Sequence, residues 1–181
     1  MPKKRIQEKP GIFYILPLAF VMAVVPLIVF MKVDMLSGAE SQAWYQDVNA
    51  DFFSFYKSQW VVISAVLAVL LFLVHGLVKK FEVKKDFLYI PTFVYAGCII
   101  LSAVLSKNKD VAINGFVARY EGMIVLLCYL ALFLAAFNLA GSESQLRFLF
   151  GALMISGAVI SLIGILQLFG RDPFKTEFGK R

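Results

Sequence analysis

Charged residues are scarce in this chain and are missing altogether from its long apolar stretches. Lys, Arg, Asp and Glu make up 17% of the 181 residues, against 60% hydrophobic residues. Soluble domains contain about a quarter charged and about half apolar residues. A charge at the centre of a membrane helix costs about 2.5–3.5 kcal/mol on insertion scales. The shortage of charge therefore argues against an ordinary soluble domain and favours a membrane protein.

Metal-binding and disulfide-forming residues are also few. The chain has one histidine, His75, and two cysteines, Cys98 and Cys128, with no CxxC spacing. A zinc site needs three or four protein ligands, so we expect no metal, no cofactor and no disulfide framework. Buried cysteines usually behave as small apolar residues, and we interpret both cysteines in that way.

Five uncharged apolar stretches are each long enough to cross a bilayer, which takes about 20 residues as a helix. We therefore predict an all-α, multi-pass transmembrane bundle of about five helices over residues 11–170. A cytoplasmic tail, 1–10, precedes the bundle and an outer tail, 171–181, follows it. Pro17 and Pro26 predict kinks in the first span. The predicted spans lie near 11–31, 58–78, 87–106, 122–142 and 148–170.

Positive charge sets the predicted orientation, because Lys and Arg gather on the cytoplasmic side of membrane spans. Four basic residues precede the first span and four separate the second from the third, but only two separate the first from the second. This predicts a cytoplasmic N-terminus and, after five spans, an outer C-terminus. We assign the net charge of +6 to contacts with membrane lipid rather than to nucleic acid. The later outer links carry more positive charge than this topology requires.

The link between the first two spans is the longest and is rich in aromatic residues. Apolar residues recur there at near-helical spacing, which predicts a short amphipathic helix at the outer membrane surface. Residues 37–40 resemble a helix capping box. The aromatic residues either anchor the second span or contact a lipid-linked substrate. The residues at this spacing are Trp44, Val48, Phe52, Phe55 and Gln59.

Small residues four positions apart in the fifth span predict close helix packing. Ala152 and Ser156 form one such pair, and Gly157 and Ser161 form another. Small residues let membrane helices approach one another closely. We therefore expect the fifth span to be central in the bundle, with Gly157 and Ser161 as candidate contacts for a partner helix.

Two segments of the predicted outer face place an arginine beside an acidic residue and a glycine. Arg119 is followed by Glu121 just before the fourth span, and Arg171 is followed by Asp172 just after the fifth. One interpretation is that each arginine reaches lipid phosphate and anchors its helix. The other is an anion site, because guanidinium offers a fork of donors that suits phosphate.

These two segments resemble motifs of the O-antigen ligase and polymerase family of bacterial enzymes. Residues 115–122, GFVARYEG, followed by YLALF at 129–133, resemble the family's R-x-E-G entry to a helix. Residues 165–174, ILQLFGRDPF, resemble its LLQ–FG–DPF helix exit. The order of the two motifs and their separation also fit the family.

The resemblance implies a metal-independent glycosyltransferase of the bacterial inner or plasma membrane. Such enzymes transfer a glycan from undecaprenyl diphosphate to an acceptor on the outer side. Arg119 and, in a looser part of the motif, Arg171 would bind the diphosphate, with support from Glu121, Lys107 and Lys109. Family members have further spans and a later outer loop with a histidine. We therefore expect the N-terminal membrane portion of such an enzyme, without catalytic residues of its own and inactive alone.

Two other functions remain open from the sequence. A small transporter subunit needs ionisable groups within the spans, and among them only His75 qualifies, near the inner end of the second span. A non-catalytic scaffold or assembly protein needs only close helix packing, which the fifth span offers.

Overall fold

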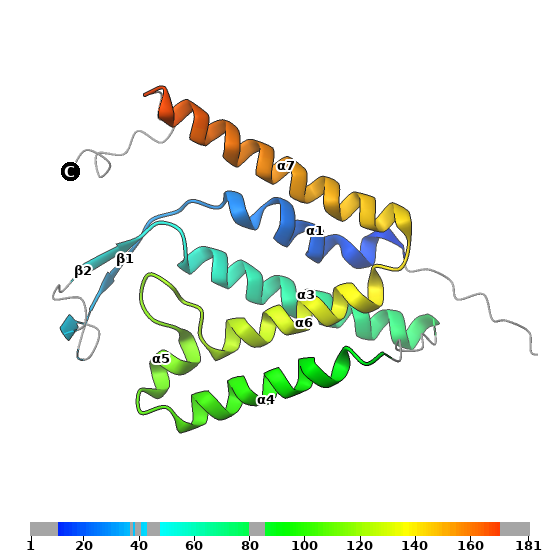
Figure 1. The fold of residues 1–181 in the computed structure, drawn as a ribbon, viewed down its shortest axis with the longest axis horizontal. Helices are drawn as coiled ribbons and strands as arrows, with labels where there is room; N and C mark the ends of the chain where they lie inside the picture. The colour runs from blue at the N-terminus through cyan, green and yellow to red at the C-terminus, as the bar shows by residue number, and fades with distance from the viewer. Residues whose placement is uncertain (1–10, 37, 39–40, 43–47, 80–85, 171–181) are drawn as a thin grey trace, which may run out of the picture.

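The computed structural model describes residues 11–36, 38, 41–42, 48–79 and 86–170, and every structural statement below concerns these residues. The two strands are β1 (Lys32–Met35) and β2 (Val48–Asp51), and the two 3-10 helices are η1 (Ile12–Ile15) and η2 (Val25–Leu27). The α-helices are α1 (Leu16–Ala23), α3 (Phe55–Lys79), α4 (Tyr89–Leu105), α5 (Lys109–Asn114), α6 (Met123–Leu139) and α7 (Glu143–Leu168). Figure 1 shows the long helices side by side in the order α7, α1, α3, α6 and α4.

Two of these helices, α3 and α7, are long and apolar enough to cross a membrane. Both leave large apolar side chains exposed: Leu70 on α3 is 51% exposed and Met154 on α7 is 74% exposed. The other apolar helices are shorter, with 17 residues each in α4 and α6. A mainly helical protein with two membrane-capable helices is confirmed, and the bundle of five spans remains a prediction.

The first predicted span is broken near Pro26, one of the two prolines predicted to kink it, and it is helical only as far as Leu27. Helix α1 ends at Ala23, a 3-10 turn follows, and residues 28–31 are not helical. Pro26 explains the break, because proline has no N–H to donate to the carbonyl four positions earlier. That carbonyl belongs to Met22, and it accepts a hydrogen bond from Ser156 Oγ on α7 at 2.8 Å instead.

The last helix begins earlier than the predicted span. The Ser142 hydroxyl accepts the backbone N–H of Gln145 at 3.2 Å, and Gln145 Oε1 accepts the backbone N–H of Ser142 at 3.0 Å. This reciprocal capping box satisfies amide groups that would otherwise lack a partner at a helix start. Helix α7 therefore starts at Glu143 and includes the charged residue Arg147.

Helix α7 lies at the edge of the bundle, so the prediction of a central position is wrong. It packs against α1 through Ala152 and Ser156, which are both buried. The second predicted pair, Gly157 and Ser161, is exposed. Among the described residues, no other long helix covers that face (Figure 1).

The first outer link contains a small antiparallel sheet, and of the helix predicted there only Ser41 and Gln42, just after the predicted capping box, are helical among the described residues. Lys32 on β1 pairs with Asp51 on β2. Val48 belongs to a strand, and α3 begins only at Phe55, so a single helix through these positions is wrong. The Asp51 carboxylate ends the strand by accepting the backbone N–H of Phe55 at 2.6 Å. Residues 37, 39, 40 and 44, which the prediction also included, lie outside the described residues.

The apolar core lies where η1, α1, α3, α6 and the first half of α7 meet. The two-stranded sheet, α5 and the loop between α5 and α6 lie together at one end of the bundle (Figure 1). The end of α3 and the turn between α6 and α7 lie at the opposite end. The described parts of the first and third links therefore share one end. Core residues include Ile15, Leu18, Val61, Ala65, Ala68, Leu132, Ala135 and Leu139.

We expect Ser156→Ala to destabilise the protein by about 0.6–1.7 kcal/mol, the range measured for hydrogen bonds between membrane helices. The substitution leaves the Met22 carbonyl without the donor that replaces the missing N–H of Pro26. The free energy of unfolding in detergent micelles measures the effect. Ser161→Ala on the exposed face of the same helix is the control. Equal effects of the two substitutions would contradict the role given to Ser156.

Candidate functional site

The loop between α5 and α6, residues 115–122, closes tightly on itself through two glycines. Gly115 has φ +91° and ψ 165°, a region that is essentially restricted to glycine. A Cβ on Gly115 would lie 2.5 Å from the backbone N of Glu121. A Cβ on Gly122 would collide with the backbone of Gly115 and Ile113. The loop therefore has a defined shape that side chains at these two positions would prevent.

The residues on either side of Arg119 have left-handed backbone conformations. Ala118 has φ 72° and Tyr120 has φ 42°. Such conformations cost about 1–3 kcal/mol each in residues other than glycine and persist only where the surroundings hold them. The hydroxyl of Ser54 holds one of them by donating to the Ala118 carbonyl at 2.8 Å. The loop thus presents Arg119 from a backbone that is fixed on both sides.

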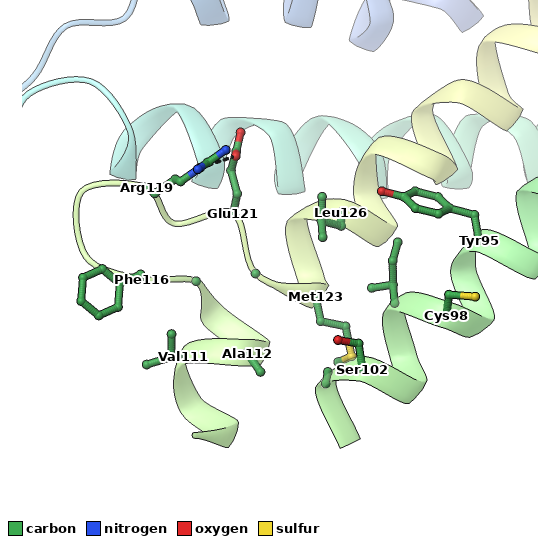
Figure 2. Close-up of a pocket in the computed structure, with 14 residues that line it drawn as sticks. Tyr95, Cys98, Ser102, Val111, Ala112, Phe116, Arg119, Glu121, Met123 and Leu126 are labelled. Carbon is green, nitrogen blue, oxygen red and sulfur yellow. Dashed lines mark hydrogen bonds and ion pairs between the residues drawn. The ribbon is translucent and has the colours of Figure 1, made fainter. Parts of the chain in front are cut away.

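A cavity of about 640 Å³ lies between this loop and helices α4, α5 and α6. Figure 2 shows the charged side chains of the loop at one side of the cavity and apolar side chains of the helices around the rest. The cavity thus joins a charged rim to an apolar interior. Residues that line it include Tyr95 and Ser102 on α4, Arg119 and Glu121 in the loop, and Met123 and Leu126 on α6.

Arg119 and Glu121 form an ion pair at the rim, with 3.1 Å between Nε and Oε2. Their side chains are 81% and 42% exposed. Ion pairs this exposed stabilise a protein by about 0–1 kcal/mol, so an anionic ligand can compete with Glu121 at little cost. Among the described residues, the pair engages only Nε, which leaves both terminal NH2 groups of Arg119 available to an anion.

The other predicted site residues are not brought to the cavity. Lys107 and Lys109 are exposed, and neither lines the cavity. Arg171 lies outside the described residues. Gly170, just before it, follows the end of α7, and α1 and α3 lie between α7 and α6 (Figure 1). The described part of the second motif is thus across the bundle from Arg119.

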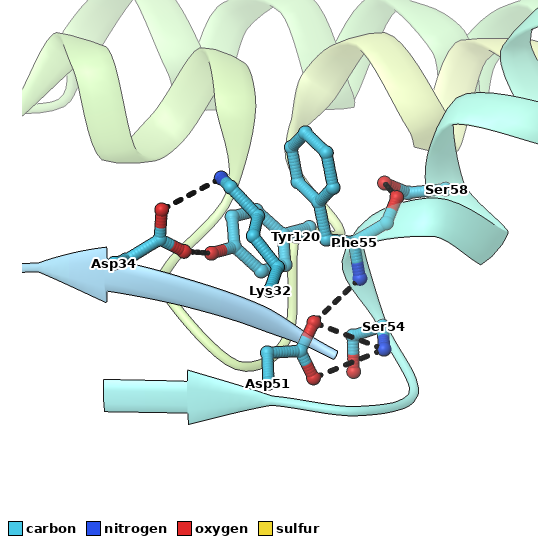
Figure 3. A network of polar contacts seen from close by, with 7 residues as sticks. All are labelled: Lys32, Asp34, Asp51, Ser54, Phe55, Ser58 and Tyr120. Carbon is cyan, nitrogen blue, oxygen red and sulfur yellow. Dashed lines mark hydrogen bonds and ion pairs between the residues drawn. The ribbon is translucent and has the colours of Figure 1, made fainter. Parts of the chain in front are cut away.

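The sequence did not point to the polar network that holds the loop (Figure 3). The Tyr120 hydroxyl donates a hydrogen bond to the Asp34 carboxylate on β1. Lys32 Nζ lies 2.8 Å from Asp34 Oδ1 and 3.6 Å from the ring centroid of Phe55. Side chains two positions apart on a strand lie on one face, so Lys32 and Asp34 lie together. This pattern was missed because the link was interpreted as a helix.

The environment of Asp34 favours its charged form. Burial acts to raise the pKa of this carboxyl, but the hydrogen bonds from Lys32 and Tyr120 and the positive charge of Lys32 outweigh it. The pKa of Asp34 therefore lies below its usual value of 3.8. Ionised Asp34 contributes stability that is fully present above the usual pKa and is lost as pH falls through the lower folded value.

Comparison of the chain with protein-family models, curated proteins and solved structures found no match. Within the described residues, no three His, Cys, Asp or Glu side chains lie close enough to hold a metal ion. The cavity offers a guanidinium, a carboxylate, the hydroxyls of Tyr95 and Ser102, the Cys98 thiol and a mainly apolar lining.

We expect Gly115→Ala to destabilise the loop by about 3 kcal/mol or more, because a forbidden φ adds to a collision with backbone atoms. Gly170→Ala is the matched control, since Gly170 also has a positive φ, +73°, but open space around it. The control should cost about 1–2 kcal/mol. Hydrogen exchange of the loop amides and the unfolding free energy measure the difference. Equal costs would show that the close backbone approach is unimportant.

We expect Lys32→Met to raise the pKa of Asp34, because burial then meets less opposition from a neighbouring charge. The carboxyl ¹³C shift of Asp34, followed by NMR against pH, measures this pKa. Lys109→Met, which removes an exposed lysine outside the network, should leave it unchanged. A pKa for Asp34 that does not change in Lys32→Met would contradict the assigned cause.

Proposed function

We propose that the chain is the N-terminal membrane portion of a bacterial glycan ligase or polymerase, and that the cavity beside Arg119 binds a saccharide linked to undecaprenyl diphosphate. The observation that carries the proposal is an arginine with free terminal NH2 groups at the rim of an apolar cavity. A lipid-linked diphosphate has the matching form, because an anionic head is joined to a long apolar tail.

The bundle of five spans is part of this proposal. Helices α4 and α6 are about 25 Å long at 1.5 Å per residue, near the lower limit for crossing a hydrocarbon core of about 30 Å. Both expose apolar side chains: Phe93 on α4 is 62% exposed and Phe133 on α6 is 44% exposed. Soluble monomers rarely expose apolar patches of such extent, which supports lipid as the surroundings of every long helix.

The arrangement of the ends supports the proposed orientation. The outer links predicted from the charge distribution contain β1, β2, α5 and the Arg119 loop, and these lie at the same end of the bundle (Figure 1). In the proposed orientation this end faces the outside of the bacterial cell membrane, and the N-terminus lies in the cytoplasm. Arg119 then lies at the membrane surface where a lipid-linked glycan would present its diphosphate.

The chemistry of transfer defines what Arg119 contributes. An acceptor hydroxyl attacks the anomeric carbon of the glycan, the bond from that carbon to the diphosphate oxygen breaks, and the lipid diphosphate leaves and takes up the hydroxyl proton. A guanidinium fixed beside the diphosphate stabilises the negative charge that develops on it. Glu121 aligns Arg119 before the ligand binds, and the exposed Lys107 and Lys109 add positive potential nearby. Arg171 was assigned to the diphosphate from the motif alone, and because α7 ends across the bundle from Arg119, the site is proposed without it.

A non-catalytic scaffold is the second candidate, and the exposed face of α7 favours it. Gly157 and Ser161 on this face permit close approach of a helix. A transporter subunit has less support, because His75 is 2% exposed, packs against the Tyr14 ring and does not line the cavity.

Binding of undecaprenyl diphosphate to the purified chain in phosphatidylcholine nanodiscs tests the proposal. We expect Arg119→Ala to weaken binding by about tenfold to a hundredfold, since a hydrogen bond to a charged group contributes about 1.5–3 kcal/mol. Glu121→Gln keeps an oxygen that can align Arg119 but removes the competing negative charge, so it should strengthen binding. Parallel measurements with phosphatidylglycerol and with inorganic diphosphate show whether the site needs both the tail and the diphosphate.

The matched control is Arg147→Ala at the other end of the bundle. Arg147 pairs with Glu143 at 3.0 Å and its side chain is 76% exposed, so it resembles Arg119 in charge and exposure but not in location. The control should bind undecaprenyl diphosphate like the unmodified chain. Equal losses in the two variants, or equal affinity for phosphatidylglycerol, would return Arg119 to the role of a lipid anchor. Association through Gly157 without any diphosphate binding would favour the scaffold.

A further inference from the structure

We propose that Asp34 and Tyr120 are positioning residues, which hold Arg119 at the rim of the cavity by tying its loop to the β1–β2 sheet. This inference rests on the proposed diphosphate site, and it assigns the control of that site to a segment far away in the sequence. The juxtaposition that carries it is the hydrogen bond from the Tyr120 hydroxyl to the Asp34 carboxylate, across 86 positions of the chain.

The first step is that Arg119 depends on its neighbours for its direction. Its side chain is 81% exposed, so packing does not hold it. The flanking residues, Ala118 and Tyr120, both have positive φ angles. Relaxation of either angle would turn the backbone at Arg119 and move the guanidinium relative to the cavity. The contacts that hold these two angles therefore set where the guanidinium lies.

The second step is that each flanking residue has its own anchor outside the loop, and Figure 3 shows the anchors of Tyr120. Ala118 is held through its carbonyl, which accepts from the Ser54 hydroxyl at 2.8 Å. Tyr120 is held by Asp34 and by an edge-to-face contact with the Phe55 ring, at 5.2 Å between centroids. The anchors belong to β1 and to the segment that leads into α3.

The third step is that the anchors are themselves fixed to one another. The Asp51 carboxylate accepts the backbone N–H groups of Phe53, Ser54 and Phe55 at 2.6–3.1 Å, which joins β2 to the start of α3. The pairing of β1 with β2 then fixes Asp34 relative to Ser54. The sheet and the helix start thus form one support for the loop.

The hydrogen bond, rather than the ion pair, is the contact that positions the loop. The Lys32 and Asp34 side chains are 27% and 21% exposed, and partly exposed ion pairs contribute little. A hydrogen bond, unlike such an ion pair, depends on the direction in which the donor meets the acceptor. Loss of the acceptor should therefore matter more than loss of the negative charge. Asn at position 34 keeps an oxygen that can accept from Tyr120, whereas Ala does not.

Affinity for undecaprenyl diphosphate in phosphatidylcholine nanodiscs, measured with the full chain, tests the inference. Tyr120→Phe, which keeps the ring, and Asp34→Ala should each weaken binding about three- to tenfold, the range expected for one hydrogen bond. The double variant should be no weaker than the single ones, because both remove the same bond. Asp34→Asn should restore affinity to within about twofold of the unmodified chain, a rescue that one restored hydrogen bond allows.

Tyr89→Phe is the matched control for stability. Tyr89 also donates a side-chain hydrogen bond between two segments, to Asn138 Oδ1 at 3.0 Å, but near the opposite end of the bundle. Tyr89→Phe should destabilise the protein about as much as Tyr120→Phe does, and it should leave the affinity for undecaprenyl diphosphate unchanged. If Asp34→Ala does not fold, the affinity of Tyr120→Phe is compared with that of Asp34→Asn, since both variants keep the native fold.

The outcomes separate this inference from the proposed function. If Arg119→Ala weakens binding but Tyr120→Phe and Asp34→Ala bind as well as Tyr89→Phe does, the positioning role is overturned. The proposed diphosphate site then remains. Arg119→Ala without effect would overturn both. A loss of affinity in Asp34→Asn as large as in Asp34→Ala would show that charge, and not the directed bond, is what acts.

Discussion

Polar groups between these helices have to find partners within the chain, because lipid surroundings would supply none. Where Pro26 leaves the Met22 carbonyl without an N–H donor, a serine hydroxyl from α7 replaces it. Where Asn138 is buried in α6, it bonds to Tyr89 on α4 and to a carbonyl of its own helix. Because bonds of this kind need specific neighbours, they fix which helices lie side by side.

The same constraint shapes the end of the molecule that contains the cavity. The chain leaves the bundle after η2, forms two short paired strands, and returns through the cap that Asp51 provides for α3. The pairing and the cap together satisfy backbone groups at the point where the bundle ends. The strand pairing and the Asp51 cap also hold the Arg119 loop. The same contacts therefore stabilise the end of the bundle and the candidate site.

Much of the helical framework could be predicted from the sequence, because the exclusion of charge from apolar stretches is a strong and local signal. Arg119 and Glu121 were predicted from a short motif, and both line the rim of the cavity. The sheet was not found, because the apolar side chains of Val48, Phe52 and Phe55 recur at helical spacing even though a strand occupies the beginning of this segment. Strand pairing depends on a partner segment that the spacing does not reveal. The support of the loop by Asp34 was missed for the same reason.

The hydrogen bond between Ser156 and Met22 has a consequence for biosynthesis. Its two residues are 134 positions apart, and a ribosome adds about 5–20 residues each second. The first helix therefore waits at least several seconds for the hydroxyl that completes its backbone bonding. Until α7 is made, the Met22 carbonyl therefore depends on water or on another protein for a hydrogen-bond donor. The arrival of α7 would then complete a structure that the earliest residues began.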